Sequence, residues 1–226
     1  MPSTVVHLAF AGLLAAALLG DAYDRRALLV VFAATAVPDL DSFLPLVSSL
    51  SHRTALHTLF LPALLALAVW LDVRREDSLL RSHWGDPGVR VAWVSVLCLA
   101  VAGIGLDLFS VQGANPLWPL VDQFYVVEGK FELSTQRGIV QTFVDLSTDS
   151  GVPQPTALGN TSEMTVTTGV DPAPSTDGGP VDRVFPIARA GWQLLLLLVG
   201  TVVTAARFYV PHRPGDEEQP TRQTQK

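Results

Sequence analysis

The sequence predicts an all-α integral membrane protein with about five transmembrane helices. Of its 226 residues, 49% are hydrophobic but only 16% are charged, whereas soluble domains carry about 25% charged residues. The apolar residues also gather into five runs, at 4–20, 27–37, 55–73, 89–109 and 187–210. Both observations are typical of a chain that crosses a lipid bilayer several times.

The first two runs need additional arguments. Run 4–20 has no preceding positive charges and is followed by Asp21 and Asp24, which favours a membrane helix over a cleaved signal peptide, the alternative. Run 27–37 is short, because a crossing needs about 20 residues. It spans only if the turn before it is tight and the Pro-Asp-Leu-Asp sequence at 38–41 lies near the membrane interface.

The other three runs are long enough to span, and the single cysteine, Cys98, lies inside the fourth, where a buried thiol is expected. Under the positive-inside rule, the regions that hold ten of the fifteen basic residues face the cytoplasm. These residues are Arg25, Arg26, Arg74, Arg75, Arg81, Arg90, Arg207, Arg213, Arg222 and Lys226. The sequence therefore predicts a multi-pass protein of the cell membrane, with its N-terminus outside and its C-terminus in the cytoplasm.

Four regions follow from this order. Residues 1–120 form a four-helix membrane domain, 121–184 an acidic extracytoplasmic insert, 185–210 the fifth helix, and 211–226 a disordered cytoplasmic tail. The insert is partly β-like at 123–133, 138–146 and 164–170, and the first two stretches are expected to pair as a hairpin. Its Thr, Ser, Gly, Pro and Asp residues from 147 to 180 favour a flexible, solvated insert, with a substrate lid as the alternative.

Six ionisable residues lie at the outer ends of the first four runs, where the helix ends can converge. Charged groups inside a membrane are costly and usually functional, and carboxylates beside imidazoles are ligands for divalent metals. The expected metal ligands are His7, Asp39, Asp41, His52, His57 and Asp107. Zinc is the first choice of ion and manganese the second. For the aspartate pair, a polar helix end at the interface is the alternative interpretation.

Local spacing refines this expectation. Pro38 should end a helix and leave Asp39 and Asp41 on an irregular turn. His52 and His57 are five residues apart, which is not one helical face, so they share a site only if His52 belongs to a loop. Arg53 either neutralises a phosphate oxygen or acts as counter-ion to the two aspartates.

The ordered motifs H-L-A-F, P-D-L-D, H-R-T-A-L-H and G-L-D-L-F-S-V-Q-G-A-N-P-L-W-P-L, between residues 5 and 120, resemble the YdjM family of membrane-bound proteins described as LexA-regulated, metal-dependent hydrolases. The resemblance implies that the same six residues are metal-site positions. It also implies a relation to zinc-dependent phospholipase C and P1 nuclease, hence a phosphoester substrate, including a phospholipid. One position departs from the family pattern, because Gly103 stands where a histidine is expected four residues before Asp107.

Two functions therefore remain open. The first is a hydrolase in which metal-activated water attacks the substrate, with Asp41 or Asp107 as general base and Arg53 beside the reacting group. The second is a catalytically inactive membrane scaffold, or a metal- or lipid-binding protein, that has lost a ligand at Gly103. The expected partners are the lipid bilayer and a small-molecule or lipid phosphoester. Nucleic acid is not expected, because basic clusters are few, and the sequence does not constrain the oligomeric state.

Overall fold

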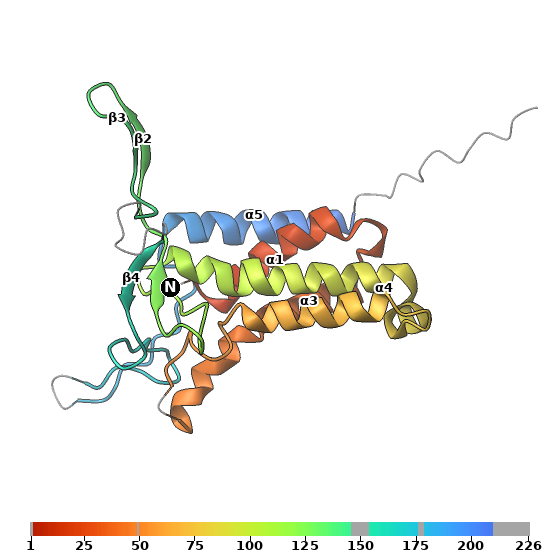
Figure 1. Cartoon of the computed structure of the whole chain (residues 1–226), viewed down its shortest axis with the longest axis horizontal. Coiled ribbons are helices and arrows are strands. Elements are labelled where there is room, and N and C mark those ends of the chain that lie inside the picture. The colour runs from red at the N-terminus through yellow and green to blue at the C-terminus, as the bar shows by residue number, and fades with distance from the viewer. Residues whose placement is uncertain (1, 49, 146–153, 176–178, 210–226) are drawn as a thin grey trace, which may run out of the picture.

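The computed structural model describes residues 2–48, 50–145, 154–175 and 179–209, and it confirms a mostly helical fold. Five α-helices form an elongated bundle with small β elements at one end (Figure 1). The helices are α1 (Thr4–Leu18), α2 (Arg25–Ala36), α3 (Phe60–Val73), α4 (Leu79–Cys98) and α5 (Gly191–Arg207). The predicted tail at 211–226 lies outside the described residues, as does part of the stretch expected to be flexible.

Two helices change their hydrogen-bonding pattern near the same end of the bundle. The side chain of Asp24 accepts a hydrogen bond from the Ala27 amide at 2.7 Å and so begins α2. Pro38 then opens a 3-10 helix, η2 (Pro38–Leu46), which bends by 42° from α2. Helix α4 continues through a π-helical segment, η3 (Leu99–Ile104), and a 3-10 turn, η4 (Gly105–Phe109). Such irregular segments are frequent at functional sites.

Five full-length transmembrane helices are not supported. Within the described residues, one helical stretch, Leu79–Phe109, is long and apolar enough to cross a membrane, and the bent pair α2–η2 is a second candidate. Helices α1, α3 and α5 have 15, 14 and 17 residues. At 1.5 Å per residue α1 is about 22 Å long, against a hydrocarbon core of about 30 Å. The apolar runs overestimate helix length, because the run that starts at residue 55 begins its helix only at Phe60.

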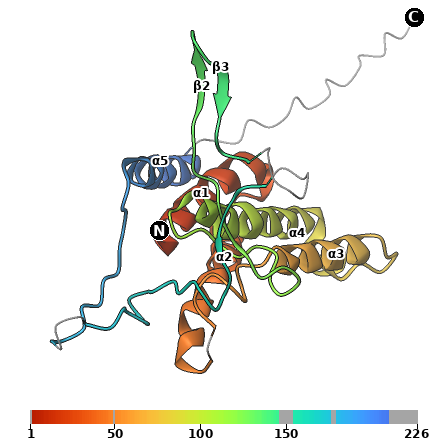
Figure 2. The ribbon, with the colours of Figure 1, turned by 60° about the vertical axis from the view of Figure 1, so that its left-hand side comes forward.

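Small residues allow the helices to approach closely. A Cβ atom on Gly200 of α5 would lie 2.4 Å from the Ala9 carbonyl oxygen, and one on Gly12 would lie 2.2 Å from the Thr204 hydroxyl. Helix α5 thus packs on α1 while α3 packs on α4 (Figure 2). The thiol of Cys98 is buried in the core between α1, α2 and α4, as the sequence predicts.

The insert after η4 contains two antiparallel strand pairs. Strand β1 (Phe124–Val126) pairs with β4 (Thr156–Gly159), and β2 (Phe131–Ser134) pairs with β3 (Gly138–Gln141). The second pair confirms the predicted hairpin. The prediction of a strand at 164–170 is wrong, because the Thr168 hydroxyl accepts hydrogen bonds from the amides of Val170 and Asp171 and closes a turn there.

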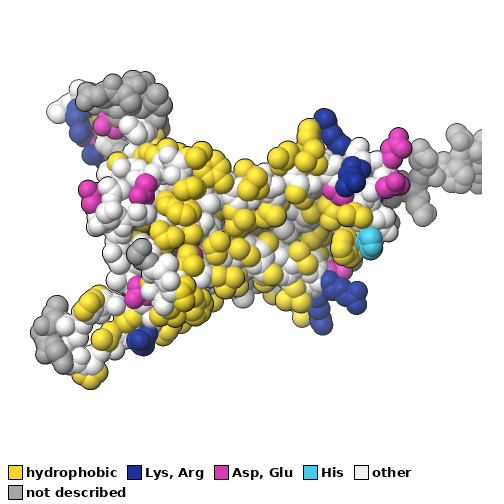
Figure 3. Space-filling model, turned by 60° about the horizontal axis from the view of Figure 1, so that its bottom comes forward, with side chains coloured by type: hydrophobic (Ala, Val, Ile, Leu, Met, Phe, Trp, Pro, Cys, Tyr) yellow, Lys and Arg dark blue, Asp and Glu magenta, His cyan; other side chains and the backbone are white. Residues whose placement is uncertain are grey.

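The surface of the helical body carries a broad apolar band. In Figure 3 hydrophobic side chains cover the middle of the molecule, and charged side chains gather toward its two ends. On α3 and α5, the exposed apolar side chains include Leu64, Leu67, Leu195, Leu198 and Val202. Exposed apolar patches of this extent mark contact with a membrane or a partner.

Candidate metal centre

All six expected ligands meet at the end of the bundle that carries the β elements. His7 projects from α1, Asp39 and Asp41 from η2, and Asp107 from η4, while His52 and His57 belong to the loop residues 50–59. Five of these side chains are at most 2% exposed, and Asp39 is 18% exposed. Residues far apart in the sequence thus form one buried polar cluster with a single partly open carboxylate.

The loop residues 50–59 place their histidines by folding onto the segment that follows η4. The amide of Asn115 donates to the Arg53 carbonyl at 3.2 Å, the Leu59 amide donates to the Pro116 carbonyl at 2.8 Å, and the Thr58 hydroxyl donates to the Trp118 carbonyl at 2.6 Å. Arg53 has a φ angle of 68°, a left-handed conformation that costs a non-glycine residue about 1–2 kcal/mol. Strain of this kind is retained mainly at functional sites.

Asp41 orients both histidines of the loop. His57 Nδ1 lies 2.8 Å from one carboxylate oxygen of Asp41, and His52 Nδ1 hydrogen-bonds the other. The two imidazole rings stand edge to face, 4.9 Å apart. Because Asp41 occupies both Nδ1 atoms, Nε2 of each ring remains for another partner, which is the arrangement that carboxylates impose on metal-binding histidines.

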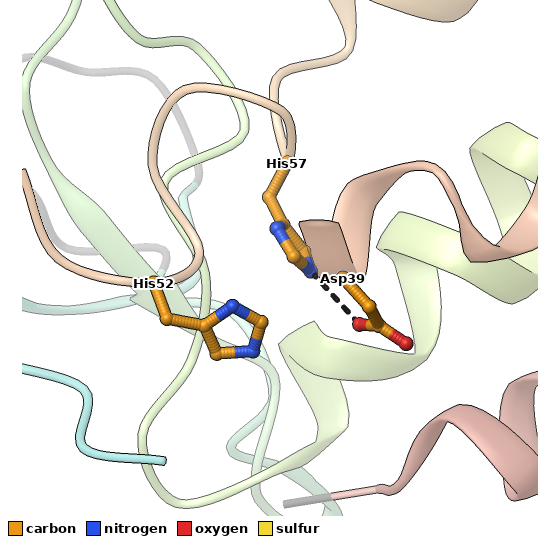
Figure 4. Close-up of side chains that lie close together, drawn as sticks. All are labelled: Asp39, His52 and His57. Carbon is orange, nitrogen blue, oxygen red and sulfur yellow. Dashed lines mark ion pairs between the residues drawn. The ribbon is translucent and has the colours of Figure 1, made fainter. Parts of the chain in front are cut away.

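Among the residues that the structure describes, two groups of three side chains are close enough to hold a metal ion. The first is Asp39, His52 and His57, and the second is His7, Asp39 and Asp107; within each, the potential ligand atoms lie within 4.8 Å of one another. In Figure 4, Asp39 and His57 point toward each other and the His52 ring faces the same space. Asp41 belongs to neither group, which differs from its expected place among the ligands.

Asp39 is common to both groups, and its two oxygens face different histidines. Oδ1 lies 3.8 Å from His57 Nε2, and Oδ2 lies 3.9 Å from His7 Nδ1. The hydroxyl of Thr4 also donates to Oδ2, at 2.5 Å. Sequence reasoning missed Thr4, although it lies three residues before His7. The geometry is that of a carboxylate able to bridge two ions.

Several buried polar atoms at the centre have no hydrogen-bond partner among the described residues. They are both ring nitrogens of His7, Nε2 of His57 and Oδ2 of Asp107. His57 Nε2 lies 3.0 Å from Asp107 Oδ2, but the two are not aligned as a hydrogen bond. Buried polar groups are nearly always paired, so unpaired ones need an explanation. Imidazole nitrogens and carboxylate oxygens that converge in this way fit a divalent cation.

Arg53 contacts Asp107 rather than the aspartate pair. Its guanidinium forms a buried ion pair with Asp107 Oδ1 and donates to the Ser110 hydroxyl at 2.6 Å and to the Gly113 carbonyl at 2.8 Å. Gly113 has a φ angle of 60°, and a Cβ there would lie 2.2 Å from the Tyr125 carbonyl oxygen. Sequence reasoning missed Ser110 and Gly113, although both lie in the motif that follows Asp107.

The loop histidines experience opposite electrostatic effects. Burial lowers the pKa of His52, and its hydrogen bond to Asp41 only partly opposes this effect. Burial also disfavours a charged His57, but the neighbouring carboxylates of Asp107 and Asp41 outweigh burial and raise its pKa to about 9. In the metal-free protein His57 is therefore protonated at neutral pH, and its proton supplies positive charge between the carboxylates.

Gly103 packs against α2 instead of facing the centre. A Cβ at this position would lie 2.7 Å from the Thr35 carbonyl oxygen and 3.3 Å from Cγ of Pro38. A histidine cannot be accommodated there without moving α2 or η3. The departure from the family pattern is thus accompanied by a close contact between these two elements.

The comparison with known proteins gives one match. The model of a family described as YdjM inner membrane protein matches residues 1–168, which includes all six residues of the centre and the first part of the insert. No curated protein and no solved structure matches the chain.

Proposed function

The chain belongs to the YdjM family of inner membrane proteins, and on this premise we propose that it is a membrane-bound, metal-dependent hydrolase of phosphoesters. The observation that carries the proposal is the pair of three-residue groups that share Asp39. Catalytic zinc sites commonly use three protein ligands and keep one position for water. Two such groups joined by a carboxylate resemble the paired-metal arrangement of phosphoester hydrolases.

The donor set favours zinc, with manganese as the second candidate. Three imidazoles suit zinc, whereas manganese prefers a larger share of oxygen ligands. His52, His57 and Asp39 would hold one ion, and His7, Asp39 and Asp107 would hold the other. When bound, such ions lower the pKa of a water molecule and stabilise negative charge on phosphoryl oxygens.

The residues of the chain have separate tasks in this proposal. Asp41 holds the two loop histidines in the orientation that leaves Nε2 free, so it is a positioning residue. Arg53 binds Oδ1 of Asp107 and so orients this carboxylate. Oδ2 of Asp107 lies 3.0 Å from His57 Nε2 and would be available to accept a proton from water once that nitrogen holds an ion. Arg53 is fully enclosed, which favours a role in positioning Asp107 over direct contact with a phosphate.

The test is metal analysis followed by a hydrolysis screen. Purified protein should contain about one to two zinc or manganese ions per chain and should cleave phosphomonoester or phosphodiester substrates. Asp39→Ala should lose both properties, whereas His57→Ala should lose hydrolysis and the ion of its own group. His83→Ala is a matched control, because His83 is exposed and lies before the kink of α4. Unaltered protein that binds no divalent ion under any loading condition contradicts the proposal.

An inactive scaffold is the second candidate, and Gly103 is the observation that favours it. The expected histidine is absent and its space is taken by Thr35 and Pro38, so the centre has one imidazole fewer than the family pattern. The scaffold would be favoured over the hydrolase if the protein binds metal but hydrolyses no phosphoester, and if its fold is the same with and without metal.

A further inference from the structure

A cavity of about 700 Å³ opens beside the candidate metal centre. Asp39 and His52 contribute to its lining, together with Ser42 of η2 and the N-terminal residues Ser3 to Val5. The remaining wall comes from residues within 167–175 and 180–189, which precede α5. The family match ends at residue 168, so this wall lies almost entirely outside the part of the chain that defines the family.

Hydrogen bonds and close packing between residues of this wall, and with the N-terminus, determine its shape. Arg183 donates to the carbonyls of Gly169 and Val170 at 3.0 and 2.9 Å, and the Ser3 hydroxyl donates to the Ile187 carbonyl at 2.5 Å. A Cβ on Gly169 would lie 2.5 Å from the Phe185 ring. The segment is therefore packed against itself and the N-terminus, and it shares the cavity lining with Asp39 and His52. This packing favours the alternative of a substrate lid over the solvated insert that the sequence favours.

The cavity is lined by both apolar and charged side chains. Val5, Val184, Phe185 and Ile187 make part of the lining apolar. Arg189 is the only lysine or arginine among the lining residues, and it forms no ion pair with any residue that the structure describes. The lining also contains two carboxylates, Asp182 and Asp39, and a metal ion would neutralise Asp39. Apolar walls, one arginine without an ion pair and a metal centre suit a ligand that has both a hydrophobic part and an anionic part.

Helix η2 connects this cavity to the apolar surface. A 3-10 helix has three residues per turn, so side chains three apart stand one above another. Asp39 and Ser42 form the row that lines the cavity. Leu40, Phe43 and Leu46 form the adjacent row, and all three are more than half exposed. Figure 1 shows this segment, in orange, turning away from the bundle. An exposed apolar row on such a segment is suited to contact with the bilayer.

We propose that the cavity binds a phosphoester of a membrane lipid, with its phosphate between Arg189 and the metal centre and its hydrocarbon chain along Leu40, Phe43 and Leu46. The reaction at the phosphate rests on the proposed function, whereas the binding of an anionic lipid rests on the cavity and on η2. Residues 167–175 and 180–189 then act as the specificity element, and Arg189 is a binding residue that the family match does not include.

Binding of non-hydrolysable analogues tests this proposal apart from turnover. The probes are a dioctanoyl glycerol phosphonate, a soluble glycerol phosphonate without chains, and dioctanoyl glycerol without phosphonate, each with full-length protein in detergent, with and without added zinc. The lipid phosphonate should bind more tightly than either other probe. Arg189→Ala should weaken its binding by about tenfold, and Arg189→Lys should weaken it less.

Two further variants complete the test. Phe43→Ser should weaken binding of the lipid phosphonate and leave binding of the soluble phosphonate unchanged. Arg137→Ala, which alters an exposed arginine of the hairpin, should change the affinity for neither probe. Equal affinity for the lipid and soluble phosphonates, or equal behaviour of Arg189→Ala and Arg137→Ala, overturns the proposal. Selective binding without hydrolysis of any phospholipid would contradict the proposed function and leave the lipid-binding cavity standing.

Discussion

Asp39 is the residue on which the candidate centre depends most, because it is common to both groups of ligands. We expect Asp39→Ala to remove metal from both groups, whereas His52→Ala should lower the content by about one ion per chain. Asp41→Asn should retain the ligands but weaken metal affinity by about 10- to 100-fold, since it disturbs only their orientation. Elemental analysis with competitive chelation measures all three. Equal losses from Asp39→Ala and His52→Ala would contradict a shared carboxylate.

Metal affinity should depend on pH through His57. Its pKa is raised to about 9 in the metal-free protein, so an ion must displace a proton from this ring below that pH. Affinity should therefore rise with pH, by up to about tenfold per unit for one displaced proton, and level off above about pH 9. Calorimetry in buffers of different ionisation enthalpy counts the protons released. A constant affinity between about pH 6 and 8 would contradict protonation of His57.

The ion pair between Arg53 and Asp107 should be costly to break from one side. Both side chains are at most 1% exposed, and removal of one partner leaves a buried charge, at a cost of about 3–5 kcal/mol. Arg53→Met should lower thermal stability strongly, and the double variant Arg53→Met, Asp107→Asn should recover part of the loss. Arg137→Ala, which removes an exposed ion pair, should change stability by less than about 0.5 kcal/mol. If the double variant recovers no thermal stability relative to Arg53→Met, the ion pair between Arg53 and Asp107 does not contribute as described.

At the scale of elements, α1 and α5 are held together by close packing at glycine. Gly200→Leu should push α5 away from the Ala9 backbone and destabilise the protein by about 1–3 kcal/mol. Gly191→Ala is the matched control in the same helix, because no atom lies within 4 Å of the added Cβ. Thermal unfolding in detergent compares the two variants. A neutral Gly200→Leu would indicate that α5 does not pack on α1 as described.

The elements also show why the sequence predicted where the ligands meet but not which residues they hydrogen-bond. Each expected ligand stands at the same end of an apolar run, so the alternation of runs and charge suffices to bring them together. The partners of Asp41 depend on a loop that folds back onto Asn115 and Pro116, and no spacing rule encodes that path. The contact between Gly103 and Thr35 is likewise tertiary. Helix length was overestimated because apolar residues continue into the loops.

For the whole molecule, the apolar band and the charges at its ends indicate how it sits in the inner membrane. Arg74, Arg75 and Arg81 lie between or within α3 and α4, at the helix ends remote from the metal centre. The positive-inside rule predicts that this end faces the cytoplasm. On that prediction the metal centre, the cavity and the β2–β3 hairpin face outward, which is the orientation expected from the sequence.

Cysteine labelling checks this orientation. In a Cys98→Ser background, Thr135→Cys in the hairpin turn should react with a membrane-impermeant maleimide in intact spheroplasts, because the hairpin lies at the outer end. Ser82→Cys in α4 should react only after the membrane is disrupted. Both positions are exposed in the structure, so unequal access reports the bilayer rather than burial. The unaltered protein is the control, since its only cysteine is buried. Labelling in the opposite order would place the metal centre in the cytoplasm, and the substrate would then have to come from the inner leaflet.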